Sequence, residues 1–195
     1  ELQTEHFQIF HHNEQLAMRI ADTLESHWKL IQTRLAPADW QANWPKPCQV
    51  YVYASKDEYQ QKSGSAAWTE GVTQIRFRPG RLSQHVIHVY QGAHLLFSSI
   101  LPHELTHVLA PWFIHYQHQL PVWLNEGMAM SSEAAFHQNY RLRLLYARMR
   151  QNRLYPLDTL FSLRQYPDDK DLFYSQSFAV VNFLLKKYGT KAWWD

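Results

Sequence analysis

The sequence contains a single cysteine, Cys48, which excludes a fold held together by internal disulfide bonds. No run of apolar residues approaches the roughly 18 that a membrane-spanning helix requires, so we expect no transmembrane segment. Neither sign of charge dominates, because 19 lysines and arginines are balanced by 17 aspartates and glutamates. The formal net charge of +2 therefore says little about partners.

The sequence is rich in apolar and aromatic residues and in histidines. Of its 195 residues, 46% are hydrophobic and 15% are aromatic, which is enough to bury a substantial core. We expect a single domain over residues 1–195, with an N-terminal lobe over about 1–110 and a helical lobe over about 111–195. The 12 histidines are many for this length and are a first indication of a metal site.

Strand patterns dominate the first part of the chain. Alternation predicts a strand over 6–12, and Asn13 is a good N-cap for the amphipathic helix that Pro37 ends. A β-rich strand over 49–53 precedes a short helix that the Ser55/Glu58 capping box opens. Two further strands, over 73–79 and 84–90, can pair as an antiparallel hairpin with its turn at Pro79-Gly80.

Helical patterns dominate the rest of the chain. The spacing of apolar residues predicts a helix over about 93–110. Pro102 either kinks this helix or is the first residue of a new one. A helix over about 132–152, a loop over 155–170 and a last helix over 175–188, which stops at Gly189, complete the layout. Strands followed by helices predict the α+β class.

The segment HELTH, residues 103–107, places two histidines four positions apart on a predicted helix. Side chains with this spacing lie one above the other, with Cβ atoms about 5–6 Å apart, so His103 and His107 can bind one ion. Glu104 points away from that ion but can reach a water bound to it, where a general base must stand. The alternative is a chance match, with two hydrogen-bonded histidines in a core helix.

Two ligands are too few for a catalytic zinc, which usually has three protein ligands and one position for water. Residues 108–125 separate His107 from Glu126, which lies in PVWLNEGMAM at the start of another predicted helix. If that helix lies antiparallel to the first, its carboxylate completes a set of two histidines and one glutamate. We therefore predict a Zn²⁺ site at His103, His107 and Glu126.

HELTH followed at this distance by WLNEG resembles the gluzincin metallopeptidases, and WLNEG is similar to the aminopeptidase N-type branch. The order of elements, ending in YSQSFAVVNFLLKKYG, resembles the bacterial peptidase MA-like domains over nearly the whole chain. The resemblance implies a two-lobed zincin-like fold in which His103, His107 and Glu126 bind zinc and Glu104 activates the water. The Gly-x-Met-Glu-Asn stretch of the aminopeptidases is absent upstream of His103, so we expect an endopeptidase rather than an aminopeptidase.

Tyr174, in FYSQSF, is the candidate for the second group that stabilises the tetrahedral intermediate, because the resembling families place a tyrosine there. The same tyrosine belongs to a helical stripe of apolar residues, so packing in the core is the alternative. The resemblance also implies that the hairpin offers an edge strand to an extended peptide, which makes a peptide or protein the expected substrate.

A second hypothesis from another class is a zinc-containing module that binds a peptide or protein without cleaving it. The remaining histidines singled out, His11, His12, His115, His118 and His137, fit surface or packing roles better than further metal sites. The arginines at 141, 143, 148, 150 and 153 fit a solvated helix face, so we expect no nucleic-acid partner. The resembling proteins are often exported, and we expect an extracytoplasmic location.

Overall fold

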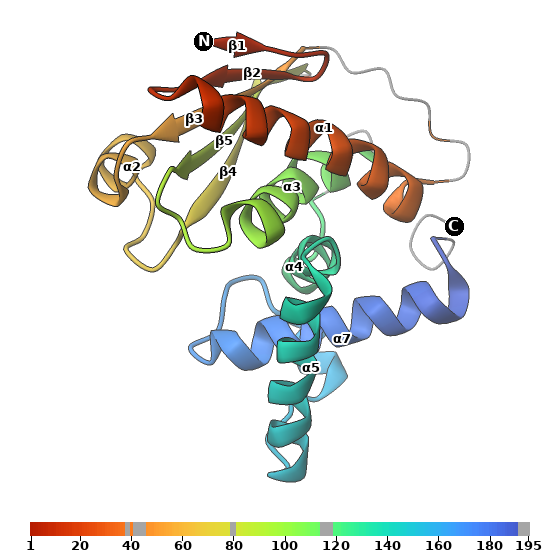
Figure 1. The fold of residues 1–195 in the computed structure, drawn as a ribbon. Coiled ribbons are helices and arrows are strands. Elements are labelled where there is room, and N and C mark those ends of the chain that lie inside the picture. The colour runs from red at the N-terminus through yellow and green to blue at the C-terminus, as the bar shows by residue number, and fades with distance from the viewer. Residues whose placement is uncertain (38–39, 41–45, 79–80, 114–118, 191–195) are drawn as a thin grey trace. The chain divides into compact units, whose positions relative to one another are not determined.

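The computed structural model describes residues 1–37, 40, 46–78, 81–113 and 119–190. Its combination of a small mixed sheet with helices confirms the predicted α+β class (Figure 1). The chain divides into two compact units. Unit 1 comprises Glu1–Leu30 and Gln41–Val108, and unit 2 comprises Ile31–Trp40 and Leu109–Asp195.

Unit 1 contains a five-stranded sheet in which β2, β3 and β5 run parallel to one another. The outer strands β1 and β4 pair antiparallel with β2 and β5, so the predicted hairpin is confirmed. In their order across the sheet, the strands are β1 (Leu2–Gln3), β2 (Phe7–Phe10), β3 (Cys48–Tyr53), β5 (Arg81–Tyr90) and β4 (Gly71–Arg78). The turn expected at Pro79-Gly80 lies outside the described residues.

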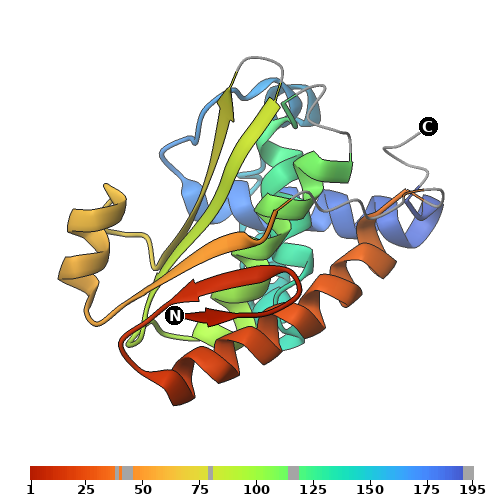
Figure 2. The same cartoon turned by 90° about the horizontal axis from the view of Figure 1, so that it is seen from above.

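Helix α1 (Glu14–Leu35) lies along one face of this sheet, as the views in Figures 1 and 2 agree. Its predicted start is confirmed, because the Asn13 side-chain oxygen accepts a hydrogen bond from the Leu16 backbone at 3.0 Å. Trp28 is buried and stacks on the His6 ring at 4.1 Å, while the carboxylate of Glu25 lies 2.7 Å from His6 Nδ1. These contacts hold α1 against the entry to β2.

The short helix α2 (Lys56–Ser63) follows β3 and confirms the predicted capping pattern. Ser55 accepts a hydrogen bond from the Glu58 backbone at 3.2 Å, and Gly64 closes the helix with φ of 69°. The Glu58 carboxylate accepts from the backbone of Ala54 at 3.0 Å rather than from that of Ser55. Tyr59 is fully buried and so anchors α2 in unit 1.

The region around Pro102 differs from a single kinked helix. A π-helix, η1 (Leu96–Ile100), runs directly into α3 (Leu101–Phe113). Pro102 therefore occupies the first turn of α3, where its missing N–H is tolerated. Leu95 starts η1 with a left-handed backbone, φ 62°. Both histidines therefore lie in the α-helical part of this segment, and a second proline, Pro111, lies further along the same helix.

The helices of unit 2 depart from the sequence-based boundaries at three places. The segment 155–170, which the sequence predicts as a loop, contains a short helix. The last helix starts at Lys170, five residues before the predicted Ser175, because Asp169 caps it. The helix predicted over 132–152 is shorter. The four helices are α4 (Val122–Ser131), α5 (Ala135–Arg150), α6 (Leu157–Ser162) and α7 (Lys170–Tyr188).

Helix α5 packs against α7, and its arginines do not all belong to a solvated face. Arg141 lies 3.2 Å from Asp171, and Arg148 lies 3.4 Å from Asp169. Arg143 and Arg150 are exposed, as the sequence predicted. Within the described residues, no helix is long and apolar enough to span a bilayer.

Helices α4 and α7 pack tightly against each other at Gly127 on α4. A Cβ atom there would lie 2.5 Å from the Ser177 carbonyl oxygen and 2.5 Å from a Val181 methyl group, both on α7. Gly127 therefore lets the two backbones pack against each other without space for a side chain. The residue before it, Glu126, is held in place by the same contact.

We expect Gly127→Ala to destabilise unit 2 by about 1–3 kcal/mol, because the added methyl group forces the α7 backbone to move. Urea denaturation followed by circular dichroism measures this loss. The control is Gly92→Ala in unit 1, where the added Cβ would meet its nearest neighbour, a ring carbon of Tyr90, only at 3.8 Å. Equal midpoints of urea denaturation for Gly127→Ala and the parent protein would contradict the close packing of α4 and α7.

Candidate metal centre

The two histidines of HELTH lie on consecutive turns of α3 and face each other. Their Nε2 atoms are 3.1 Å apart, and their ring planes cross at 81°. Both side chains are half-buried. The regular helix therefore produces the convergence of imidazoles that the four-residue spacing predicts.

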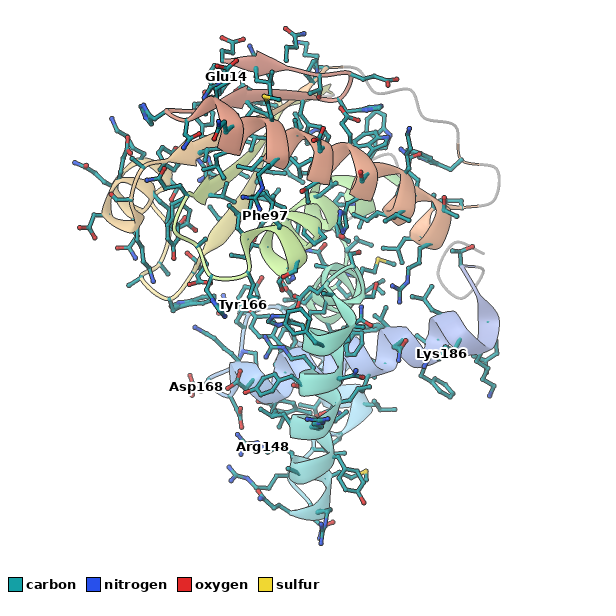
Figure 3. The ribbon with its side chains drawn as sticks, viewed as in Figure 1. Glu14, Phe97, Arg148, Tyr166, Asp168 and Lys186 are labelled. Carbon is teal, nitrogen blue, oxygen red and sulfur yellow. The ribbon has the colours of Figure 1, made fainter. Side chains whose placement is uncertain are left out.

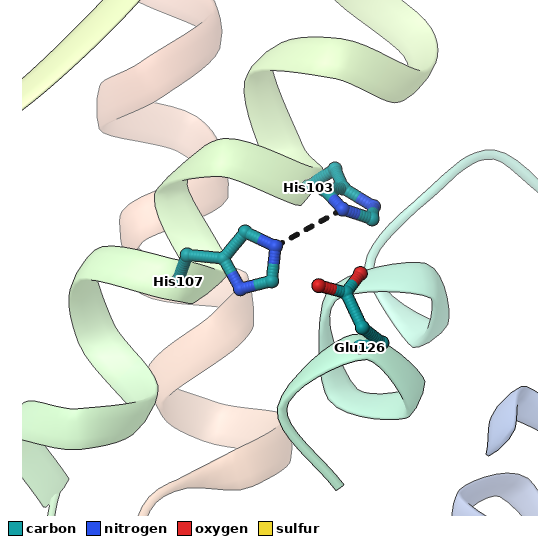
Figure 4. Close-up of side chains that lie close together, drawn as sticks. All are labelled: His103, His107 and Glu126. Atoms are coloured by element: carbon teal, nitrogen blue, oxygen red, sulfur yellow. Dashed lines mark hydrogen bonds between the residues drawn. The ribbon is translucent and has the colours of Figure 1, made fainter. Parts of the chain in front are cut away.

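Glu126, on α4, is 3% exposed. One ligand atom each from His103, His107 and Glu126 lies within 4.8 Å of the other two (Figure 4). Around a tetrahedral zinc with bonds of about 2.0–2.2 Å, ligand atoms lie about 3.4 Å apart. The separation of the two imidazole nitrogens is already near this value, so the donor set fits a single metal ion.

Sequence reasoning did not find Tyr166, although it contacts this cluster. Its hydroxyl donates a hydrogen bond to Glu126 Oε1 at 2.5 Å. Tyr166 lies between α6 and α7, in the segment that the sequence predicts as a loop (Figure 3). A tyrosine outside regular structure gives no periodic signal, so nothing in the local sequence indicates this contact.

Glu104 is 7% exposed and lies against strand β4. The Thr73 hydroxyl lies 2.8 Å from Glu104 Oε2 and 2.9 Å from the Glu104 carbonyl oxygen, so it donates to one of them at a time. On the same strand, a Cβ atom at Gly71 would come within 3.0 Å of the Glu104 side chain. Glu104 is therefore held by β4, on the side of α3 that faces the sheet.

The carboxylates of Glu104 and Glu70 place negative charge near Tyr59. Burial raises the pKa of the Tyr59 phenol, and the negative charges of Glu104 and Glu70 raise it further, against the lowering effect of its hydrogen bonds to Ser65 and Thr69. Burial also raises the pKa of Tyr90, as do its hydrogen bond to Glu70 and the charge of that carboxylate. Both phenols are therefore neutral at physiological pH and add no negative charge beside Glu104.

Tyr174 lies inside α7, whereas the sequence placed it before the last helix. The Arg141 guanidinium sits over its ring at 5.6 Å, and the ring of Tyr166 is 6.0 Å away. Tyr174 thus lies next to the tyrosine that bonds to Glu126. Its role as an oxyanion donor stays a prediction.

Packing accounts for other histidines. Burial lowers the pKa of His85 to about 4, and His88 Nδ1 lies 2.8 Å from the Tyr53 hydroxyl. His137 is 3.7 Å from the buried Glu133. His115 and His118 lie outside the described residues. Among the residues that are described, His103, His107 and Glu126 form the one group with metal-binding geometry.

The comparison with protein families decides what kind of fold carries this cluster. Residues 32–193, which include α3, α4 and α7, match the family model of the peptidase MA superfamily. The chain belongs to the peptidase MA superfamily. No curated protein matches the sequence. Membership of this superfamily supports a metallopeptidase activity in general terms. The side chains of His103, His107 and Glu126 lie close enough together to bind a metal ion.

We expect the purified protein to hold about one divalent ion per chain after dialysis, and His103→Ala or Glu126→Ala to lose it, because two ligands cannot retain a catalytic metal. Atomic emission spectrometry measures the metal content. His12→Ala is the matched control, since His12 is an exposed histidine outside the cluster. Retention of a full equivalent by both ligand variants would mean that the metal binds elsewhere.

Proposed function

We propose that the protein is a zinc-dependent endopeptidase with His103, His107 and Glu126 as metal ligands and Glu104 as general base. The observation that carries this proposal is the convergence of the three ligand atoms within 4.8 Å. Superfamily membership supports it independently, because peptidases share that superfamily. As predicted from the sequence, the proposed arrangement has an N-terminal lobe over about 1–110 and a helical lobe over about 111–195.

The donor set supports zinc as the metal. Two imidazole nitrogens and one carboxylate oxygen suit a tetrahedral zinc with its fourth position open to water, while calcium and magnesium prefer sites made of oxygen atoms alone. When bound, zinc supplies Lewis acidity and lowers the pKa of a bound water to about 7. The remaining chemistry belongs to side chains of this chain.

In this mechanism Glu104 moves the proton. As the water oxygen attacks the peptide carbonyl carbon, the Glu104 carboxylate accepts a proton from that water. It then delivers the proton to the leaving nitrogen as the C–N bond breaks, so the carboxylate is restored. Thr73 helps to hold Glu104 Oε2 by a hydrogen bond at 2.8 Å, which limits the rotation of the carboxylate without neutralising it.

Strand β4 supports an extended peptide as the substrate. It is the last strand in the order β1-β2-β3-β5-β4 of the described sheet, and its residues Gly71 and Thr73 touch Glu104. A peptide that added to this strand by main-chain hydrogen bonds would run past the general base. This arrangement favours unfolded segments of proteins over compact ones.

Glu104→Gln should reduce cleavage at least about 100-fold while leaving zinc content unchanged, because general acid–base catalysis typically contributes about 10²–10⁴-fold and an amide cannot accept the proton. Denatured casein and a library of internally quenched peptides measure cleavage, and atomic emission measures zinc. Glu14→Gln, which changes an exposed glutamate at the start of α1, is the matched control.

The same variant separates a peptidase from a module that binds without cleaving. A zinc-loaded parent protein that binds members of the library but cleaves none, with unaltered binding by Glu104→Gln, would establish the binding module instead.

Tyr174→Phe tests the second catalytic group. If the Tyr174 hydroxyl donates a hydrogen bond to the developing oxyanion, its loss should lower kcat about 100- to 1000-fold, with little change in KM or in zinc content. Steady-state kinetics on one quenched peptide measure this. If the variant keeps its full kcat, Tyr174 serves only in the packing of α7, where its ring contacts that of Phe173.

A further inference from the structure

The hydrogen bond between Tyr166 and Glu126 joins a partly exposed phenol to a buried carboxylate. Tyr166 is 46% exposed, whereas Glu126 is 3% exposed. The distance of 2.5 Å between the hydroxyl oxygen and Oε1 is at the short end of the range for a hydroxyl that donates to a charged carboxylate. Both residues belong to unit 2, so the bond is part of the internal structure of that unit.

Packing fixes both ends of this bond. The Tyr166 ring meets the Phe173 ring edge-on, with centroids 5.9 Å apart and planes at 88°, and Phe173 is fully buried. Glu126 precedes Gly127, where α4 packs tightly against α7. Since α7 carries Phe173 and also packs against Gly127, one helix sets the positions of both partners.

We propose that Tyr166 is a positioning residue that holds the Glu126 carboxylate in its ligand orientation. This inference rests on the proposed metal site. An ionised carboxylate has two oxygens, and the phenol bonds to Oε1. This hydrogen bond restricts rotation of the carboxylate and so helps to keep it turned toward the imidazoles of His103 and His107. Groups that orient a metal ligand in this way typically contribute about 10- to 100-fold in metal affinity.

Tyr166→Phe removes the hydroxyl and keeps the ring against Phe173. Zinc affinity, measured by competition with a chromophoric chelator, should fall about 10- to 100-fold. The melting temperature of the metal-free protein should stay within a degree or so of the parent value, because the ring packing is unchanged. The matched control is Tyr146→Phe on α5, where the side chain is 59% exposed; its zinc affinity should equal that of the parent.

A double-mutant cycle distinguishes positioning from a structural role. Glu126→Ala loses its zinc on dialysis, so the cycle uses the residual weak affinity of that background, titrated with an excess of zinc. If Tyr166 acts through Glu126, Tyr166→Phe should not weaken this residual affinity further. An equal loss in both backgrounds would overturn the inference, as would an affinity of the single variant within twofold of the parent value. In either case a loss of zinc by Glu126→Ala alone leaves the proposed function standing. A parent protein that binds no zinc would instead overturn the proposed function, and this inference with it.

Discussion

The four-residue spacing of His103 and His107 on α3 is the constraint on which the proposed chemistry depends. A regular helix turns both imidazoles to the same side, with their Nε2 atoms 3.1 Å apart. Glu104, one residue after His103, is turned toward strand β4 and bonds to Thr73. In the proposed mechanism, a single helical turn thus directs the metal ligands and the general base to different sides of α3. This separation requires regular geometry at the histidines, and η1 ends on the N-terminal side of them.

The segment WLNEG shows how a short motif combines two physical requirements. Glu126 supplies a carboxylate to the cluster, and Gly127 allows the backbones of α4 and α7 to approach until a Cβ would lie 2.5 Å from a carbonyl oxygen. A side chain at 127 would push α4 away and move the preceding carboxylate with it. The glycine is thus a condition for the position of the glutamate, which explains why the two are adjacent.

Most of the fold could be predicted where local patterns are strong. The period of α1, the capping residues Asn13 and Ser55 and the alternation of the hairpin each follow from interactions between residues near in sequence. The π-helix, the short helix α6 and the early start of α7 could not, since tertiary packing and a single cap decide them. The motif likewise predicted the cluster of His103, His107 and Glu126, while the contacts of Thr73 and Tyr166, which are distant in sequence, could not be predicted from it.

Those two missed residues have a common physical role. Glu104 and Glu126 are both nearly buried, and a buried carboxylate is costly unless it accepts hydrogen bonds. Thr73 bonds to the first and Tyr166 to the second, and each is a neutral hydroxyl. An arginine or lysine in the same place would also stabilise the charge, but it would compete with a cation for Glu126 and lower the basicity of Glu104. Hydroxyl partners stabilise each carboxylate and leave its negative charge available for the proposed roles, metal binding by Glu126 and proton transfer by Glu104.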